Sequence, residues 1–480
     1  MISKQEILSA ATQMSLTPHV VEKDYVLGWV LAGIDAHPVL RESWVFKGGT
    51  CLKKCYFETY RFSEDLDFTL RDAAHLEEGF LRDAFAQIGA WVYDHTGIEV
   101  PAERQEFDIY ANPRGNLSCQ GKLSYRGPVS PRDMPRIKLD LTADERLVLP
   151  PVRVPVFHPY SDAPEETIEA LAYAYEEVFA EKTRALAERT RPRDLYDVIN
   201  LFRNEAARPS PPIICDVLQQ KCDFKGIGFP ALGELEQHRG ELENLWGSML
   251  AHQLPMLPPY QAFWDELPAF FEWLAGGATP EMPAAFAMGA GETVLRERRL
   301  NLRVGSSTLS AIEIIRFAAA NRLLVELTYD DSVRRIEPYS LRETRDGNVL
   351  LHAFNTDRGQ HRSYRIDRIQ GARVTNQGFV PRYEIELTPQ LPLRIAPRAA
   401  RASTSVARPA ARKAQTFGQP RRPATKKTPT YGSGPTYVYR CPICQKKFRR
   451  SSMDGKLNAH KNDWGGQCMG RTGFLDEVKY

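Results

Sequence analysis

The feature that most constrains this fold is a basic, acid-free segment at residues 391–436. It contains ten Lys/Arg, no Asp or Glu, and many Pro, Ala, Ser and Thr residues. Such a composition buries too little apolar surface to offset the entropy lost on ordering, so we predict a disordered linker. The linker separates a long N-terminal part from a short C-terminal module at 437–480.

Charge is distributed unevenly along the chain. Residues 391–480 hold 19 Lys/Arg against 4 Asp/Glu, a net charge of +15. The whole 480-residue chain carries only +3, so residues 1–390 carry −12. A basic tail on an acidic body predicts that the tail binds a nucleic acid or another polyanion.

The bulk features indicate a multidomain intracellular protein. A chain of 480 residues exceeds one ordinary hydrophobic core. The apolar run Val26–Ile34 is too short to span a bilayer, and no signal-peptide pattern is present, so we expect a cytoplasmic protein without a membrane partner. Five of the eight cysteines are scattered and are interpreted as small buried apolar residues.

Hydrophobic periodicity predicts an α+β domain over residues 1–300, with a helical appendage at 230–285. The predicted helices span Met1–Ala36, Ala73–His95, Pro164–Glu188 and Arg193–Asn204, and the predicted strands span Asp65–Leu70 and Ile137–Thr142.

The hydrophobic pattern changes at residue 306. For residues 306–388 it predicts one helix followed by a small, strongly bent β-barrel. The helix is expected at Ser310–Ala320, and the strands at Leu324–Tyr329, Arg335–Tyr339, Val349–Phe354, Ser363–Ile366 and Tyr383–Leu387. Turn signals such as Asp346-Gly347-Asn348 separate the strands.

The candidate metal-binding carboxylates are Asp65 and Asp67. Acidic and apolar residues alternate from Asp65, which places both carboxylates on one face of a strand. Two adjacent carboxylates repel each other unless a cation such as Mg²⁺ lies between them. Asp140, in the second predicted strand, is a candidate third acid; the alternative is a solvated polar face.

Two further segments are candidates for binding a phosphate chain. Lys47-Gly48-Gly49-Thr50 precedes a helical stretch, and glycines there let backbone N–H groups approach phosphate oxygens; the alternative is a plain turn. Lys182 offers a point charge, and Asp194 and Asp197 share one face of the next helix. That cluster by itself equally suits an ordinary salt-bridged surface helix.

The C-terminal module contains a candidate zinc site. Cys441, Cys444, His460 and Cys468 form a C-x₂-C-x₁₅-H-x₇-C pattern, and Cys₃His is a tetrahedral Zn²⁺ ligand set. We expect the metal to stabilise this module around Phe448, Leu457 and Trp464. Neighbouring basic residues suggest phosphate contacts, with protein binding as the alternative: Lys446, Lys447, Arg449 and Arg450.

Four segments together resemble the AbiEii/AbiGii toxin family of nucleotidyltransferases, in the polymerase-β-like superfamily. They are Glu22-Lys23-Asp24-Tyr25, Phe46–Thr50, Arg61–Asp67, and Ala180-Glu181-Lys182 with Arg193–Asp197. The resemblance covers roughly residues 15–260 and is carried by the order of the segments more than by any one of them.

This resemblance implies a polymerase-β-like core, an NTP substrate and a catalytic Mg²⁺ site. Asp65, Asp67 and Asp140 would bind the metal, and Lys182 and Asp194 would be essential for activity. The implied nucleotide-binding residues are Lys47, Gly48, Gly49, Thr50, Ser63 and Lys182. Family members are toxins of abortive-infection or toxin–antitoxin systems, some of them acting on tRNA 3′ ends, and a separately encoded antitoxin neutralises them.

Residues 308–378 resemble a WYL domain, a small Sm-like barrel of bacterial regulators and defence proteins. The matching segments are Ile336–Tyr339 and Tyr364–Ile369, whereas Val349-Leu350-Leu351 replaces the signature Trp-Tyr-Leu. The resemblance implies that Tyr364, Arg365 and Arg368 receive a nucleic acid or nucleotide effector; the alternative is that Tyr364 and Arg368 are structural.

We therefore expect a nucleotidyltransferase that transfers NMP from an NTP to RNA, with a tRNA 3′ end as the favoured acceptor. One alternative is a DNA-binding regulator whose transferase fold is inert. Another is an enzyme that nucleotidylates a protein or a small molecule.

Overall fold

A computed structural model describes residues 1–57, 61–129, 134–277, 283, 291–296, 306–387, 436–441, 446–450, 456–461, 467–468, 472 and 474–479. The chain divides into two compact units, residues 1–410 and 411–480. The predicted linker at 391–436 lies almost entirely outside the described residues. We call residues 1–277 the N-terminal part and residues 306–387 the barrel part.

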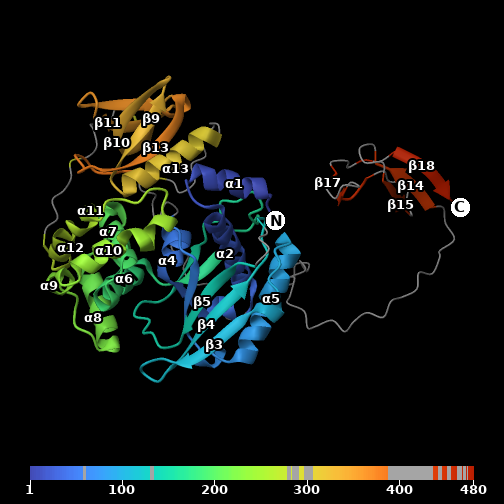
Figure 1. The fold of residues 1–480 in the computed structure, drawn as a ribbon, viewed down its shortest axis with the longest axis horizontal. Helices are drawn as coiled ribbons and strands as arrows, with labels where there is room; N and C mark the ends of the chain where they lie inside the picture. Colours follow the sequence, from blue (N-terminus) through green and yellow to red (C-terminus); the bar gives the residue numbers. More distant parts are fainter. Residues whose placement is uncertain are drawn as a thin grey trace, which may run out of the picture. The chain divides into compact units, whose positions relative to one another are not determined.

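The N-terminal part is built on a seven-stranded mixed sheet with the order β3-β4-β5-β2-β1-β7-β6 (Figure 1). The β2–β5 and β1–β7 pairs are parallel and the other pairs are antiparallel. The strands are β1 (Trp44–Lys47), β2 (Asp65–Leu70), β3 (Glu106–Ala111), β4 (Leu117–Ser124), β5 (Arg136–Thr142), β6 (Val152–Pro155) and β7 (Glu169–Ala172).

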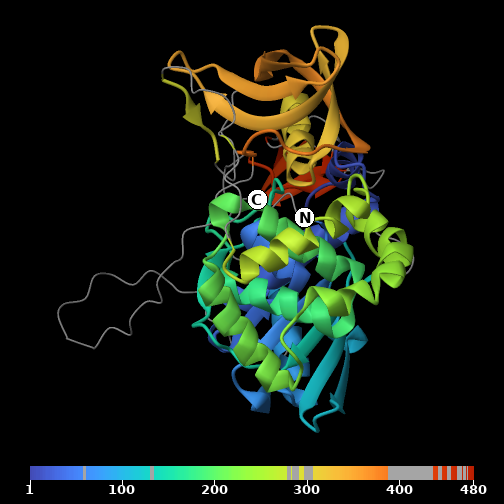
Figure 2. The same ribbon diagram turned by 90° about the vertical axis from the view of Figure 1, so that its left-hand side faces the viewer.

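The helices of the N-terminal part form two groups. An early group contains α1 (Lys4–Gln13), α2 (Pro18–Ala36), α3 (Leu40–Ser43), the short α4 (Gly48–Cys51) and α5 (Glu78–Thr96). A later group, green in Figures 1 and 2, contains α6 (Tyr175–Arg189), α7 (Pro192–Arg203), α8 (Pro211–Lys225), α9 (Leu232–Glu236), α10 (Arg239–Leu250), α11 (Gln261–Trp264) and α12 (Leu267–Leu274). In the later group α6 packs on α7 and α8, and α10 packs on α7.

The predicted strand periodicity of β2 and β5 is confirmed. Ile137, Leu139 and Leu141 of β5 are buried, as are Leu66 and Phe68 of β2. Burial of these apolar side chains on one face of the sheet leaves the acidic side chains on the other face.

Two predicted helices of the N-terminal part were wrong in extent. Residues 164–174 are not helical, because Glu169–Ala172 instead pairs with β1 and β6 as strand β7. The helix predicted over Met1–Ala36 is broken at Ser15, whose φ of 53° lies in the left-handed region. The appendage expected at 230–285 is helical from α9 to α12 within the described residues.

The barrel part consists of α13 (Ser306–Ala320) and a bent antiparallel sheet with the order β12-β11-β10-β9-β13, to whose β10 the short β8 (Thr293–Val294) also pairs. The strands are β9 (Leu323–Tyr329), β10 (Ser332–Glu343), β11 (Val349–Asn355), β12 (Gln360–Arg365) and β13 (Ile369–Gly378). The prediction of a strand at Tyr383–Leu387 was wrong, because Ile369–Gly378 takes the place beside β9.

The C-terminal unit is small and rich in β-structure. Its strands are β14 (Thr436–Arg440), β15 (Lys447–Arg450), β16 (His460–Lys461), β17 (Gln467–Cys468) and β18 (Phe474–Lys479). Its core contains Tyr439 and the predicted Leu457, and the partly buried Phe448, also predicted, packs against it; Trp464 lies outside the described residues. Nowhere in the described part of the chain is a helix long and apolar enough to cross a membrane.

Candidate active site

Three carboxylates meet on the polar face of the central strands. β2 and β5 run parallel, and their register places Asp67 directly beside Asp140 and Asp65 beside Lys138. Asp65 and Asp67 are two residues apart on β2 and therefore project to the same side. The parallel pairing thus gathers all three predicted acids.

The electrostatics of this cluster favour a cation. Burial, and then the charge of Asp140, raise the pKa of Asp67 to about 6. Burial, and then the charge of Asp65, raise the pKa of Asp140 above its ordinary value. Burial is the larger cause of both shifts and repulsion between the ionised carboxylates is the next, and a divalent cation bound by their oxygens would compensate both.

The predicted glycine segment, Lys47–Thr50, lies against this cluster, where strand β1 ends and helix α4 begins; we call it the glycine turn. β1 pairs antiparallel with β2 so that Lys47 lies opposite Asp67, and Gly48 follows with a φ of +82°. A Cβ atom added at Gly48 would lie 2.1 Å from an Asp67 carboxylate oxygen. One added at Gly49 would lie 2.6 Å from a guanidinium nitrogen of Arg61. At Gly48 both the backbone conformation and the approach of Asp67 require glycine, whereas a side chain at Gly49 would have to displace the end of Arg61.

Two constraints act at Gly48, its left-handed backbone conformation and its close approach to Asp67, and a matched pair of variants separates them. Gly97 has a similar φ, +79°, but a Cβ atom there would meet nothing within 4 Å. We expect Gly97→Ala to cost about 1–2 kcal/mol of stability, the cost of a left-handed alanine, and to leave activity unchanged. Gly48→Ala adds displacement of Asp67 and is expected to lower nucleotide transfer at least about 100-fold. Denaturant unfolding measures the stability of both variants, and initial rates measure their activity. Equal activities of the two variants would contradict the prediction.

Helices α6 and α7 place a buried ionic network opposite the acids. Lys182 Nζ lies 2.7 Å from Asp197 Oδ2 and 3.8 Å from Asp194 Oδ1. Asp197 also accepts two hydrogen bonds from Arg61, at 2.8 and 2.9 Å. Burial alone would raise the pKa of Asp197, but the charges of Arg61 and Lys182 outweigh it and hold the pKa below its usual range.

Asp194, the predicted site residue of α7, is paired mainly with Arg189. Asp194 accepts two hydrogen bonds from Arg189, at 2.8 and 2.9 Å. Both aspartates are buried, so their neighbouring cations compensate charges that would otherwise be costly. These ion pairs join α7 to α6 and to Arg61, and they thereby orient the first turn of α7 relative to the acids of the sheet.

A cavity of about 390 Å³ joins these groups. The predicted site residues that line it are Lys47, Gly48, Gly49, Ser63, Asp65, Asp67, Asp140, Lys182 and Asp194. Thr50 does not line the cavity; its hydroxyl donates to the Asp65 backbone carbonyl and so joins the glycine turn to β2. The acids of the sheet face a predominantly basic wall formed by Lys182, Arg184, Arg189, Arg191 and Arg193.

Sequence reasoning did not select Arg61, Asp197 or Arg189 as site residues. Arg61 and Asp197 are 136 residues apart, and only the packing of α7 brings them together. One signal was available, since Asp197 lies one helical turn after Asp194 and shares its face.

The Glu22-Lys23-Asp24-Tyr25 segment supports the site from outside the cavity. Lys23 Nζ lies 2.6 Å from Glu64, which directly precedes the acidic strand β2. Asp24 lies 2.7 Å from Lys54, which follows the glycine turn. These two contacts anchor the segment before β2 and the segment after α4 to α2.

The barrel residues expected to bind an effector differ in exposure. Tyr364 is buried and its hydroxyl accepts a hydrogen bond from Asn355 at 3.1 Å, a contact that serves packing. Arg365 and Arg368 are on the surface, near Asp367 at 2.7 Å and Asp330 at 3.8 Å, respectively. Tyr364 is buried while both arginines are at the surface, and the role of the three residues stays a prediction.

Three of the four predicted zinc ligands converge in the C-terminal unit. Ligand atoms of Cys441, His460 and Cys468 lie within 4.8 Å of one another, and the two sulfur atoms are 3.6 Å apart. Zn–S bonds of about 2.3 Å at a tetrahedral angle place two sulfurs about 3.8 Å apart, so the donors fit zinc. Cys444 lies outside the described residues, as do the side chains of Arg449 and Arg450.

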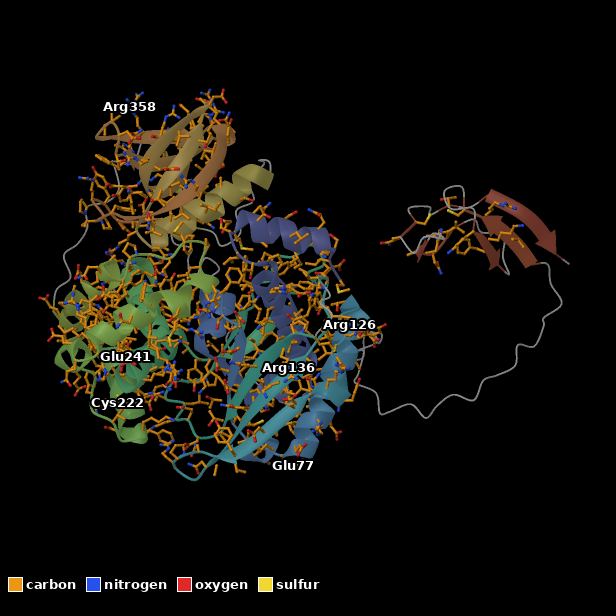
Figure 3. The ribbon with its side chains drawn as sticks, viewed as in Figure 1. Glu77, Arg126, Arg136, Cys222, Glu241 and Arg358 are labelled. Carbon is orange, nitrogen blue, oxygen red and sulfur yellow. The ribbon has the colours of Figure 1, made fainter. Side chains whose placement is uncertain are left out.

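The zinc assignment predicts one tightly bound zinc ion per chain. We expect Cys468→Ser to lose that ion and to expose the C-terminal unit to proteolysis, because the metal supplies much of the folding energy of so small a core. The matched control is Cys222→Ser, a buried cysteine in the helical group of the N-terminal part (Figure 3). Elemental analysis of dialysed protein tests this, and equal zinc in both variants would contradict it.

Comparison with known proteins identifies both large parts of the chain. The family model described as nucleotidyl transferase AbiEii toxin, type IV TA system, matches residues 29–275, and a WYL domain model matches residues 310–374. No curated protein matches the chain.

Two solved structures are similar to the chain at a distance. MenT4, a nucleotidyltransferase toxin from Mycobacterium tuberculosis H37Rv, is 17% identical with a TM-score of 0.37, over 58% of this chain and 91% of that one. The proteasome accessory factor PafBC of Arthrobacter aurescens is 11% identical with a TM-score of 0.15, over 77% of this chain and 74% of that one. Because the family model spans half of the chain, this protein belongs to the AbiEii nucleotidyltransferase toxin family and carries a WYL domain after its transferase domain.

Proposed function

We propose that this enzyme is a Mg²⁺-dependent toxin that transfers NMP from an NTP to an RNA 3′ hydroxyl, with tRNA as the preferred acceptor. The observation that carries the proposal is one cavity in which three carboxylates face a wall of basic side chains across a glycine turn. We take the domains to be a transferase at 1–300, a WYL barrel at 306–388, a basic linker at 391–436 and a zinc module at 437–480.

The residues present fit a divalent metal. The neighbouring carboxylates of Asp67 and Asp140 each have a raised pKa, which a bound cation would lower. Asp65, Asp67 and Asp140 would hold Mg²⁺, which supplies charge neutralisation at the phosphates when bound.

The chain's own residues then have distinct roles. Gly48 and Gly49 admit the phosphate chain close to the backbone, and Lys47 and Lys182 offset its charge. Asp197 and Asp194 hold Lys182 at the cavity. In the reaction the acceptor oxygen bonds to the α-phosphorus as the bond to pyrophosphate breaks, so positioning and charge compensation account for most of the catalysis.

Labelled nucleotides test the proposal directly. The full-length protein is incubated with each α-³²P NTP, Mg²⁺, total RNA and cell protein, in parallel with Asp65→Ala. We expect label in small RNA with the wild-type enzyme alone. Label in protein instead of RNA would reject the RNA acceptor, and equal labelling by Asp65→Ala would reject this cavity as the active site.

We further propose that the basic tail raises the local concentration of the RNA acceptor. Residues 391–480 carry a net charge of +15, and Lys446 and Lys447 closely follow the predicted zinc ligands Cys441 and Cys444 in the sequence. A gel shift with and without residues 391–480 tests this role, and unchanged RNA affinity would reject it. A separately encoded antitoxin is the protein partner that we propose from family membership.

A further inference from the structure

A second cavity, of about 310 Å³, lies where the N-terminal part meets the barrel part. The C-terminal half of α7 forms one wall, the end of α13 forms another, and residues 380–385 close a third side. Both parts belong to one compact unit, and a hydrogen bond of 2.8 Å from Tyr196 of α7 to Asn321 joins them beside the cavity. This cavity is separate from the active site but shares helix α7 with it.

The polar atoms of this cavity that lack a partner are all donors. Among the described residues, none accepts a hydrogen bond from Arg203 Nη1, Asn204 Nδ2 or Arg322 Nε, although all three atoms are buried. The three side chains line the cavity, and the Arg203 side chain and Asn204 are each only 5% exposed. Buried N–H groups in native proteins are normally paired, so three orphaned donors at one cavity indicate a missing acceptor.

The cavity is lined by three arginines and three glutamates, so the orphaned donors rather than a net charge favour an anion. Arg203 and Arg322 share a single carboxylate, Glu266, at 2.7 and 2.6 Å. Burial, and then the nearby charge of Arg203, lower the pKa of Arg322 to about 10. The other lining carboxylates already face arginines, since Glu205 is near Arg208 and Glu384 is near Arg296.

Most of the remaining wall is apolar. It includes Phe57, Phe202, Ala269, Ala319, Ala320 and Ile385. A volume of about 310 Å³ with apolar walls and a few convergent polar groups is typical of small-molecule sites. A bare ion would leave most of this wall without contact, so the occupant needs an apolar or aromatic body.

We propose that this cavity binds a small organic oxyanion, whose phosphate or carboxylate group accepts hydrogen bonds from Arg203, Asn204 and Arg322 while its apolar body packs on α7 and α13. The site does not depend on the proposed reaction. It gives the barrel part a ligand-dependent contact with the helix that also carries Asp194 and Asp197.

Calorimetric titration of the full-length, Mg²⁺-free protein tests the site. The probes are phenyl phosphate, benzoate and the neutral benzamide. Binding of either anion without binding of benzamide supports the site, and the stronger anion tells a phosphate ligand from a carboxylate ligand. Binding of neither anion, or equal binding of benzamide, would overturn it.

Three variants locate the binding. Ala320→Leu fills the cavity, Asn204→Asp replaces a donor with a negative charge, and both are expected to abolish binding. Arg322→Lys keeps a cation for Glu266 but removes Nε, and is expected to weaken binding at least about tenfold. Melting curves without ligand establish whether each variant is folded. If Ala320→Leu or Asn204→Asp unfolds the chain, the binding affinity of Arg322→Lys tests the proposal instead.

A further control distinguishes anion binding at the second cavity from anion binding at the active site. Lys47→Met removes a cation of the active-site cavity and leaves the second cavity intact. Binding that survives in Lys47→Met and is lost in Ala320→Leu supports the proposal. The reverse pattern would assign the anion to the active site and overturn it.

Discussion

Replacing Asp67 with asparagine is expected to abolish nucleotide transfer, with a fall of at least about 1,000-fold, while the protein stays folded. Asparagine matches the shape of aspartate but removes the charge beside Asp140 that a metal would require. Initial rates at saturating Mg²⁺ measure the effect. The matched control is Asp216→Asn, on the surface of α8, which is expected to retain full activity.

The same substitution should change the pH dependence of stability in the metal-free protein. The folded-state pKa of Asp67 is raised to about 6 from an ordinary 3.8, so the folded state binds the proton more tightly than the unfolded state. The stability contributed by this group therefore grows as the pH falls from above 6 toward 4, and is lost as the pH rises.

Thermal melts in EDTA between pH 4.5 and 7.5 measure this contribution. Asp67→Asn is expected to flatten the profile and to melt higher than the wild type at pH 7.5. Added Mg²⁺ should raise the wild-type melting temperature at pH 7.5 and leave the variant unchanged. A wild-type profile identical to that of Asp67→Asn would show that Asp67 does not carry the raised pKa.

Replacing Asp197 with alanine is expected to destabilise the fold by about 3–5 kcal/mol as well as to inactivate it. The side chain is fully buried between Arg61 and Lys182, and its removal leaves both cations without their shared carboxylate. Urea unfolding measures the loss. Asp216→Ala, at an exposed position, is the control and is expected to change stability by less than about 0.5 kcal/mol.

A double-mutant cycle separates pairing from packing at this site. If Asp197 acts through Arg61, Arg61→Met combined with Asp197→Ala should cost much less than the sum of the two single changes. Because the pKa of Asp197 is held below its usual range, the stability of the pair is present above pH 4 and is lost only at more acidic pH. Additive costs would contradict a direct ion pair.

The sequence by itself determined the features that depend on local periodicity and spacing. The alternation around Asp65 and Asp67 fixes which side chains share a strand face, because side chains alternate across any strand. The glycines at the start of α4 could be interpreted because their role is conformational, and the Cys/His spacing could be interpreted because tetrahedral zinc sites have a limited set of ligands.

Only the tertiary structure decided the features that depend on pairing between distant segments. Glu169–Ala172 has a helix-like local pattern, but pairing with β1 and β6 makes it a strand. Arg61 meets Asp197 only because α7 packs against the loop before β2, and the α7–α13 cavity exists only because the barrel part packs on the helices. Local sequence carries no record of such contacts, because their free energy comes from burial and charge pairing between residues far apart in the chain.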